Sequence, residues 1–231
     1  MLAELAGGAS PDGPQRLLSF SPWGEDACRD ALSRYVARHL GDPGAVLAAG
    51  EAGFVKEGEM PAGVARMCTG TAGRVENCQV GVFLSCAAPA GSRALTGREL
   101  YLPDKRAGGR GRCRAAGTGG DVGFAAKPEL ARKMIARAVA AGVPSGWVAG
   151  DEVYGGNPGP RSWLEEEGIC SVMAVACGEP AGVPAGPFRA DALAALVPAR
   201  AGSGCPAPTA RRGRGCMTGR WPAPPPPAIS C

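Results

Sequence analysis

Two segments of the chain carry apolar residues at the three- and four-residue steps of an amphipathic helix. The first, residues 22–40, has Glu25 and Asp26 in its first turn, where their charges suit the positive end of a helix dipole. The second, residues 127–141, has Pro128 in its first turn, where a missing N–H costs nothing. Its predicted buried stripe consists of Leu130, Met134, Ile135 and Ala138. We therefore expect two helices, each with one face turned to a core.

Short apolar runs between turn residues predict strands. The first three follow one another through Gly-rich turns and indicate an antiparallel meander. They cover residues 45–49, 79–87 and 94–102. After the second helix come a strand that begins at Trp147, a short helix at residues 162–167 and a buried strand at residues 170–176. This order predicts an α/β domain with a mixed sheet flanked by helices.

Two other regions lack such a pattern. Residues 103–123 are rich in Gly and Arg, and we expect an exposed insertion there. From about residue 201 the sequence is dominated by Gly, Pro and Arg and is predicted to form a disordered tail without elements, because it buries too little apolar area to offset the entropy of ordering. The expected division is a helical segment at 1–42, an α/β domain at 43–200 and a tail at 201–231.

Composition narrows the class of protein. With 231 residues, 45% of them hydrophobic, the chain can form one core. Its ten cysteines include no Cys-x-x-Cys pair and His39 is the one histidine, so neither a zinc site nor a disulfide framework is expected. No apolar run approaches the ~18 residues of a membrane span, and no secretory signal is recognised, so we expect a cytoplasmic protein. The formal charge of +4 favours nucleic acid only weakly.

The strand that begins at Trp147 runs directly into Asp151 and Glu152. A strand end holds a carboxylate rigidly while its tip meets solvent, which suits metal binding or proton transfer. The earlier apolar run at residues 45–49 has the same shape but ends in Gly50, where a second carboxylate would complete a metal pair. From these residues alone, an acid that caps a turn is the favoured interpretation of Asp151, because few such residues bind metals.

Several blocks of sequence, in one consistent order, resemble transposases of the insertion-sequence-701 group. The blocks are Gly70–Phe83, Arg98–Pro103, Lys127–Ala131 and Gly150–Gly155. The resemblance implies a ribonuclease-H-like fold, incomplete in this chain, and a DDE mechanism in which two Asp and one Glu hold two divalent ions, usually Mg²⁺. It also implies cleavage and transfer of DNA strands at the terminal repeats of an insertion sequence.

Carried over residue by residue, the resemblance makes Asp151 the second catalytic Asp and a metal ligand. The first Asp belongs at position 50, which is Gly50 here. Glu51 matches the family's own neighbouring Glu, and a one-residue step along a strand turns its side chain to the opposite face. The catalytic Glu belongs to a helix beyond the resemblance, and residues 165–167 match a surface turn instead. We therefore expect an inactive chain in which Mg²⁺, the family's cofactor, has lost ligands.

Basic residues near these blocks are candidate contacts to a DNA backbone, because each neutralised phosphate adds to affinity. They are Arg74, Arg98, Lys105, Arg106 and Lys127. A solvated loop face explains the same residues equally well. Three interpretations stay open: an inactive transposase remnant, a non-catalytic DNA-binding or inhibitory protein that assembles with an intact transposase, and an unrelated ribonuclease-H-like hydrolase with a rearranged metal site.

The resemblance runs from about Leu2 to Ala199, which is the middle of a full family member, so truncation at both ends is expected. The helical segment at 1–42 would then be a remnant of the DNA-binding part. Residues 215–221, read in a shifted frame of GC-rich codons, give Arg-Leu-Tyr-Asp-Trp-Ala-Val, which resembles sequence that family members carry further on. A frameshift near residues 199–202 is the resulting hypothesis, and sequencing the gene tests it.

Overall fold

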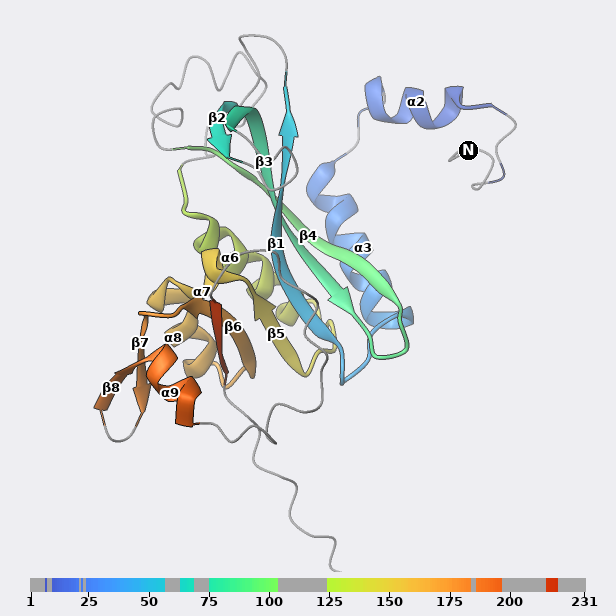
Figure 1. The fold of residues 1–231 in the computed structure, drawn as a ribbon. Coiled ribbons are helices and arrows are strands. Elements are labelled where there is room, and N and C mark those ends of the chain that lie inside the picture. The colour runs from blue at the N-terminus through green and yellow to red at the C-terminus, as the bar shows by residue number, and fades with distance from the viewer. Residues whose placement is uncertain are drawn as a thin grey trace, which may run out of the picture.

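The computed structural model describes residues 10–20, 24–56, 63–68, 75–103, 124–183, 186–196 and 215–219, together with Gly7 and Pro22. Within these residues a seven-stranded sheet has the order β2-β3-β1-β5-β6-β9, and β4 pairs with β3 beside this path (Figure 1). Its strands are β1 (Val46–Val55), β2 (Ala65–Cys68), β3 (Val75–Ala87), β4 (Arg93–Tyr101), β5 (Trp147–Gly150), β6 (Ser171–Ala176) and β9 (Gly215–Gly219). A separate hairpin pairs β7 (Pro180–Val183) with β8 (Gly186–Arg189).

Among the described residues, two helices precede the first four strands and four more lie between the later strands. They are α2 (Asp12–Ser19), α3 (Glu25–His39), α6 (Lys127–Ala140), α7 (Glu152–Gly155), α8 (Pro158–Glu166) and α9 (Ala190–Leu196). α3 confirms the first predicted helix and α6 the second, with Pro128 in its first turn.

β1 lies near the centre of the sheet. Along its whole length it pairs antiparallel with β3, from Val46 opposite Ala87 to Val55 opposite Cys78. On its other side it runs parallel to β5, which runs parallel to β6, while β4 is antiparallel to β3. Strands β1, β3 and β4 therefore confirm the predicted meander. The parallel strands that follow complete the mixed, ribonuclease-H-like sheet.

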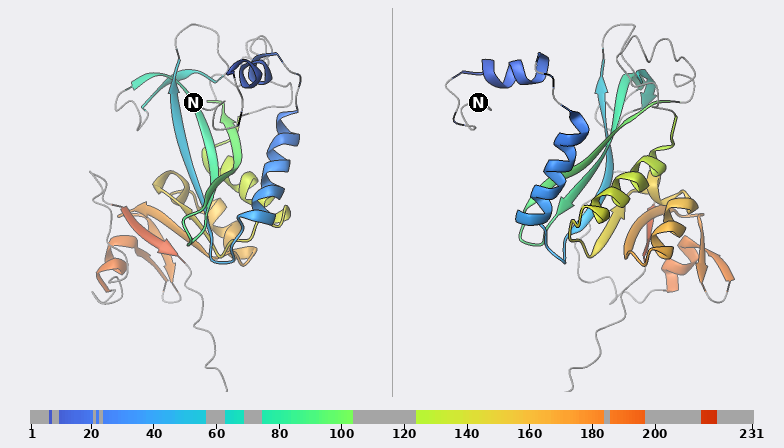
Figure 2. Two further views of the ribbon diagram at one scale, coloured as in Figure 1. Left: turned by 90° about the vertical axis from the view of Figure 1, so that its right-hand side faces the viewer. Right: turned by 180° about the vertical axis from the view of Figure 1, so that it is seen from behind.

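One face of this sheet is covered by helices. Side chains alternate along the strands, so that Leu47, Val82 and Leu84 are fully buried on this face. The predicted stripe of α6 is buried against β3 and β4, and α3 adds Val36 to the same core along β4. Seen from behind, α3 and α6 lie over the same side of the sheet (Figure 2). We refer to this side as the helix face and to the other side of β1 and β3 as the open face.

Some elements differ from the predicted ones. β1 continues past residue 49 to Val55, because pairing with β3 satisfies backbone groups that an apolar pattern does not signal. β2, which has no apolar run, pairs with the start of β3. α8 begins at Pro158 rather than residue 162, since the Asn157 side chain caps it by accepting a hydrogen bond from Gly159 N.

The expectation of a tail without elements is wrong for Gly215–Gly219. These residues form β9, which pairs antiparallel with β6. The edge of β6 offers backbone groups that a strand can satisfy without contributing a large apolar surface. Residues 104–123 of the expected insertion, and residues 201–214 and 220–231 of the expected tail, lie outside the described residues.

Candidate active site

The ends of β1 and β5 bring Gly50 and Asp151 next to each other. The two strands are parallel and in register, with Ala49 opposite Gly150, so the next step sets Gly50 beside Asp151. Asp151 continues the strand with extended dihedral angles, φ −78° and ψ −172°. Its exposed side chain then caps α7, because Oδ1 accepts a hydrogen bond from Val153 N at 2.9 Å.

Gly50 and Asp151 lie on the open face, whereas the residues before them lie on the helix face. A β-carbon built on Gly150 would meet the Met173 sulfur at 2.9 Å and Tyr154 at 3.0 Å, which belong to the core under the helices. A β-carbon built on Gly50 meets no heavy atom of another described residue within 4 Å. Position 50 therefore has room for a carboxylate that the sequence does not supply.

The side chain of Glu51 points to the helix face, whereas Gly50 and Asp151 lie on the open face. Its carboxylate accepts from Lys127 Nζ at 2.6 Å, with 27% and 22% of the two side chains exposed. The hydroxyl of Tyr154 donates to the other carboxylate oxygen at 3.4 Å. Glu51 thus connects β1 to the start of α6 and to α7. The alternation expected along the strand holds, and this carboxylate does not share a face with position 50.

Tyr154 is the buried member of this cluster, with 3% of its surface exposed. Burial, then the negative charges of Glu51 and Asp151, then the hydrogen bond to Glu51 raise the pKa of the Tyr154 hydroxyl well above its usual range. The phenol therefore stays protonated and donates to Glu51. No local pattern signals this contact, because Tyr154 stands in the sequence as an ordinary residue of a glycine turn.

Of the five candidate DNA contacts, the structure describes Lys127 and Arg98, and each of these two pairs with a carboxylate. Lys127 is engaged by Glu51 and lies 5.4 Å from the centre of the Tyr101 ring. Arg98 pairs with Glu25 at 3.1 Å, with both side chains well exposed. The other three candidates, Arg74, Lys105 and Arg106, lie outside the described residues. Lys127 therefore has a structural partner that competes with a phosphate.

The side chains at this place do not fit a pair of divalent ions. Two-metal sites use carboxylates from several elements, and Mg²⁺ requires near-octahedral oxygen ligands. Here position 50 has no side chain, Glu51 is turned away, and Asp151 already accepts from a backbone amide. Across the described ranges, no three residues of the His, Cys, Asp and Glu types form a group able to hold a metal ion.

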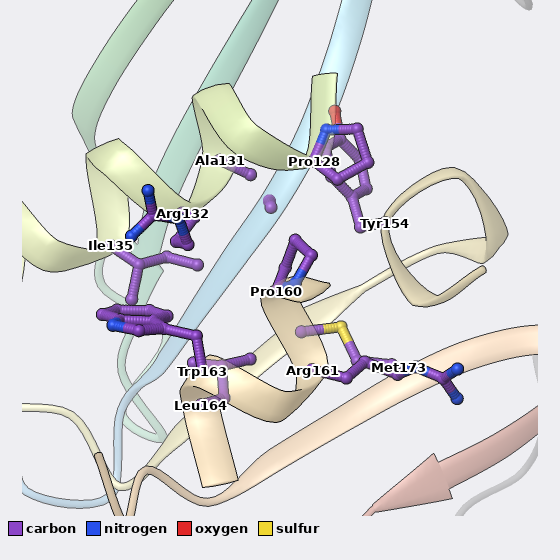
Figure 3. Close-up of a pocket in the computed structure, with 11 residues that line it drawn as sticks. Pro128, Ala131, Arg132, Ile135, Tyr154, Pro160, Arg161, Trp163, Leu164 and Met173 are labelled. Carbon is purple, nitrogen blue, oxygen red and sulfur yellow. The ribbon is translucent and has the colours of Figure 1, made fainter. Parts of the chain in front are cut away.

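A small gap lies behind β1 on the helix face, between α6 and α8 (Figure 3). Its walls are largely apolar and include Ala49, Ile135, Leu164 and Met173. The guanidinium of Arg132 lies 5.7 Å from the centre of the Trp163 ring at its rim. The gap is on the opposite side of the sheet from the open face at position 50, so it belongs to the packing of the helices.

The fold and the position of Asp151 define a class of protein before any comparison. A central strand flanked by an antiparallel meander and two parallel strands, with an acidic residue at the end of the first parallel one, is the ribonuclease-H-like arrangement of nucleases and transposases. Residues 1–224 match the family of DDE superfamily endonucleases, and the chain belongs to that family. The match continues beyond residue 199, where the resemblance in the sequence ended.

Membership of this family makes DNA the substrate class and divalent metal ions the general cofactors of the chain's relatives. It supports a transposase-like nuclease as the type of protein. The chain matches no curated protein. Over the described residues, no helix has the length and apolar character needed to cross a membrane.

Proposed function

We propose that this chain is a transposase-type member of the DDE family, of the insertion-sequence-701 group, that binds DNA without cleaving it. The observation that carries the proposal is Gly50 beside Asp151. In the proposed assignment Asp151 descends from the second catalytic Asp, and Gly50 occupies the place of the first.

The chemical argument concerns the number of ligands. In-line attack on a phosphodiester by two ions requires carboxylates that hold both ions and neutralise the developing charge. Mg²⁺ in proteins usually keeps several waters and takes one or two carboxylates. The single exposed carboxylate of Asp151 can therefore serve one ion at most, and the described residues offer no group of three ligand side chains for the second. Glu51 cannot move into the place of the missing ligand without leaving Lys127 and Tyr154.

A non-catalytic role on DNA is the function that this arrangement supports. The sheet has the framework of the family, and the open face carries the exposed basic side chains of Lys56 and Arg66. Such a protein can occupy DNA ends or join an assembly of an intact transposase and so inhibit it. Assembly with an intact relative is part of the proposal, as is preference for terminal repeats.

Nicking of supercoiled DNA by the purified chain, in Mg²⁺ or Mn²⁺, tests the proposal. We expect the wild type and Asp151→Asn to give the same background. Asparagine keeps the oxygen that caps α7 but removes the charge, so it is a matched control for folding. Metal-dependent nicking by the wild type that is lost in Asp151→Asn would overturn the proposal.

A further inference from the structure

A row of polar side chains crosses three strands where β1 ends. Arg66 on β2 is opposite Asn77 on β3. Lys56 N donates to Asn77 O at 2.9 Å, which continues the pairing of β1 with β3 one step beyond Val55 and Cys78. Paired residues of antiparallel strands project to the same face. Lys56, Asn77 and Arg66 therefore stand side by side, and all three are exposed.

The two basic members of this row differ from the other basic residues near the site. Lys127, Arg98 and Arg137 each pair with a carboxylate. Lys56 and Arg66 have no such partner within the described part of the chain. Their charges are therefore available to phosphate oxygens without first breaking an ion pair.

An aromatic surface adjoins the row on the same face. Phe54 precedes Lys56 by two residues, is 49% exposed, and meets Phe83 edge to face at 6.4 Å between ring centres. Both rings lie over Gly81, where a β-carbon would come within 2.8 Å of the Phe83 ring and 3.8 Å of the Phe54 ring. The absence of a side chain at Gly81 thus lets the rings rest on the sheet.

This surface is continuous with position 50. Alternation along β1 puts Gly50, Ala52 and Phe54 on the open face, and Lys56 follows in the same sequence. The seven residues from Gly50 to Lys56 make six steps along the strand, which span about 20 Å at ~3.3 Å per step.

We propose that one unpaired DNA strand lies along this face, with its phosphates on Lys56 and Arg66 and a base stacked on Phe54. The inference rests on the proposed function, which makes DNA the partner. A single strand is favoured over a duplex because only unpaired bases expose their faces to an aromatic side chain. Asn77, between the two basic residues, can donate to and accept from a base edge or a sugar.

The test uses fluorescence anisotropy of a labelled oligothymidine strand and a duplex of equal length, titrated with the full chain in EDTA over a range of salt. Lys56→Gln with Arg66→Gln should reduce the slope of log affinity against log salt by about 1.4, at ~0.7 for each phosphate contact on a single strand. Phe54→Leu should weaken binding about 5- to 150-fold. Phe54→Tyr should retain binding.

The matched control is Arg34→Gln with Arg38→Gln, which removes two exposed charges from α3 on the other side of the molecule. This control should leave the salt slope unchanged, and thermal unfolding of every variant checks its fold. An equal decrease of the salt slope in the two double variants would overturn the inference. So would an affinity for the duplex that equals the affinity for the single strand and is unaffected by Phe54→Leu. DNA binding that ignores Lys56 and Arg66 contradicts this inference alone, whereas no DNA binding by the wild type contradicts the proposed DNA partner as well.

Discussion

Gly50→Asp supplies a carboxylate where the structure has room for one. Parallel neighbours in a sheet lie ~4.8 Å apart, and the register puts position 50 beside Asp151. Because a β-carbon at Gly50 meets no other described residue, steric strain is small. Two exposed carboxylates ~5 Å apart repel each other by about 1 kcal/mol in a water-like dielectric. The variant should therefore be less stable than the wild type when no metal is present.

A repulsion of this size is large enough to move the midpoint of thermal unfolding. For a chain of this length, 1 kcal/mol shifts the midpoint by about 2–4 °C. A divalent ion that binds between the two carboxylates stabilises the folded state by about 2.7 kcal/mol when its concentration is 100 times the dissociation constant. In EDTA, the midpoint of thermal unfolding of Gly50→Asp should thus lie a few degrees below that of the wild type. As Mn²⁺ is added, the midpoint of this variant should rise above its value in EDTA.

The assay is thermal unfolding followed by circular dichroism, with Mn²⁺ titrated into each variant. Ala52→Asp is the matched control, since residue 52 lies on the same face of β1, opposite Gly81 and two residues beyond Gly50. Equal stabilisation of Ala52→Asp by Mn²⁺, or no metal effect on Gly50→Asp, would refute the reasoning. Nicking of DNA should stay absent in Gly50→Asp, because the change supplies two carboxylates where the mechanism uses three.

Three further predictions concern the contacts behind the site. Glu51→Ala and Tyr154→Phe should each lower the free energy of unfolding by about 1 kcal/mol. The double variant should lose less than the sum of the two, because one hydrogen bond joins the two groups. Additive losses in urea denaturation would contradict the contact. The pKa of Tyr154 is raised in the folded chain, so above pH ~10 this phenol ionises in the unfolded chain while it stays protonated in the folded one. The free energy of unfolding should therefore fall as the pH rises further. Tyr154→Phe should make this alkaline loss of stability smaller. An unchanged alkaline slope is the opposing result. Met134→Ala should cost about 2–5 kcal/mol through the cavity it leaves, while the exposed neighbour Lys133→Ala should change stability by less than ~0.5 kcal/mol.

The parts of the fold that follow from local pattern were predictable. The stripe of α6 is an example, because Leu130, Met134, Ile135 and Ala138 repeat at helical spacing and all four are buried. The second half of β1 was missed, because Glu51 and Gly53 interrupt its apolar run and only the partner strand β3 holds it extended. β9 was missed for the same reason, since its order comes from the edge of β6.

The candidate site was predictable only in part. The resemblance in sequence named positions 50 and 151, and the parallel pairing of β1 with β5 makes them neighbours. The partner of Lys127 could not be read from the sequence, because Glu51 lies 76 positions away and reaches it from another element. The row formed by Lys56, Asn77 and Arg66 depends on the register of three strands, which no local pattern encodes.

Because Asp151 caps α7, two different requirements can act on this one position: metal binding and helix capping. Metal binding favours a carboxylate at such a position, whereas capping tolerates Asp, Asn and Ser about equally. In a lineage that has lost catalysis, substitutions at position 151 should therefore spread among these three residue types and avoid apolar ones. The hydrogen bond that Asp151 accepts from Val153 N is a structural reason for an aspartate at this position, so an aspartate here is not by itself a sign of enzymatic activity.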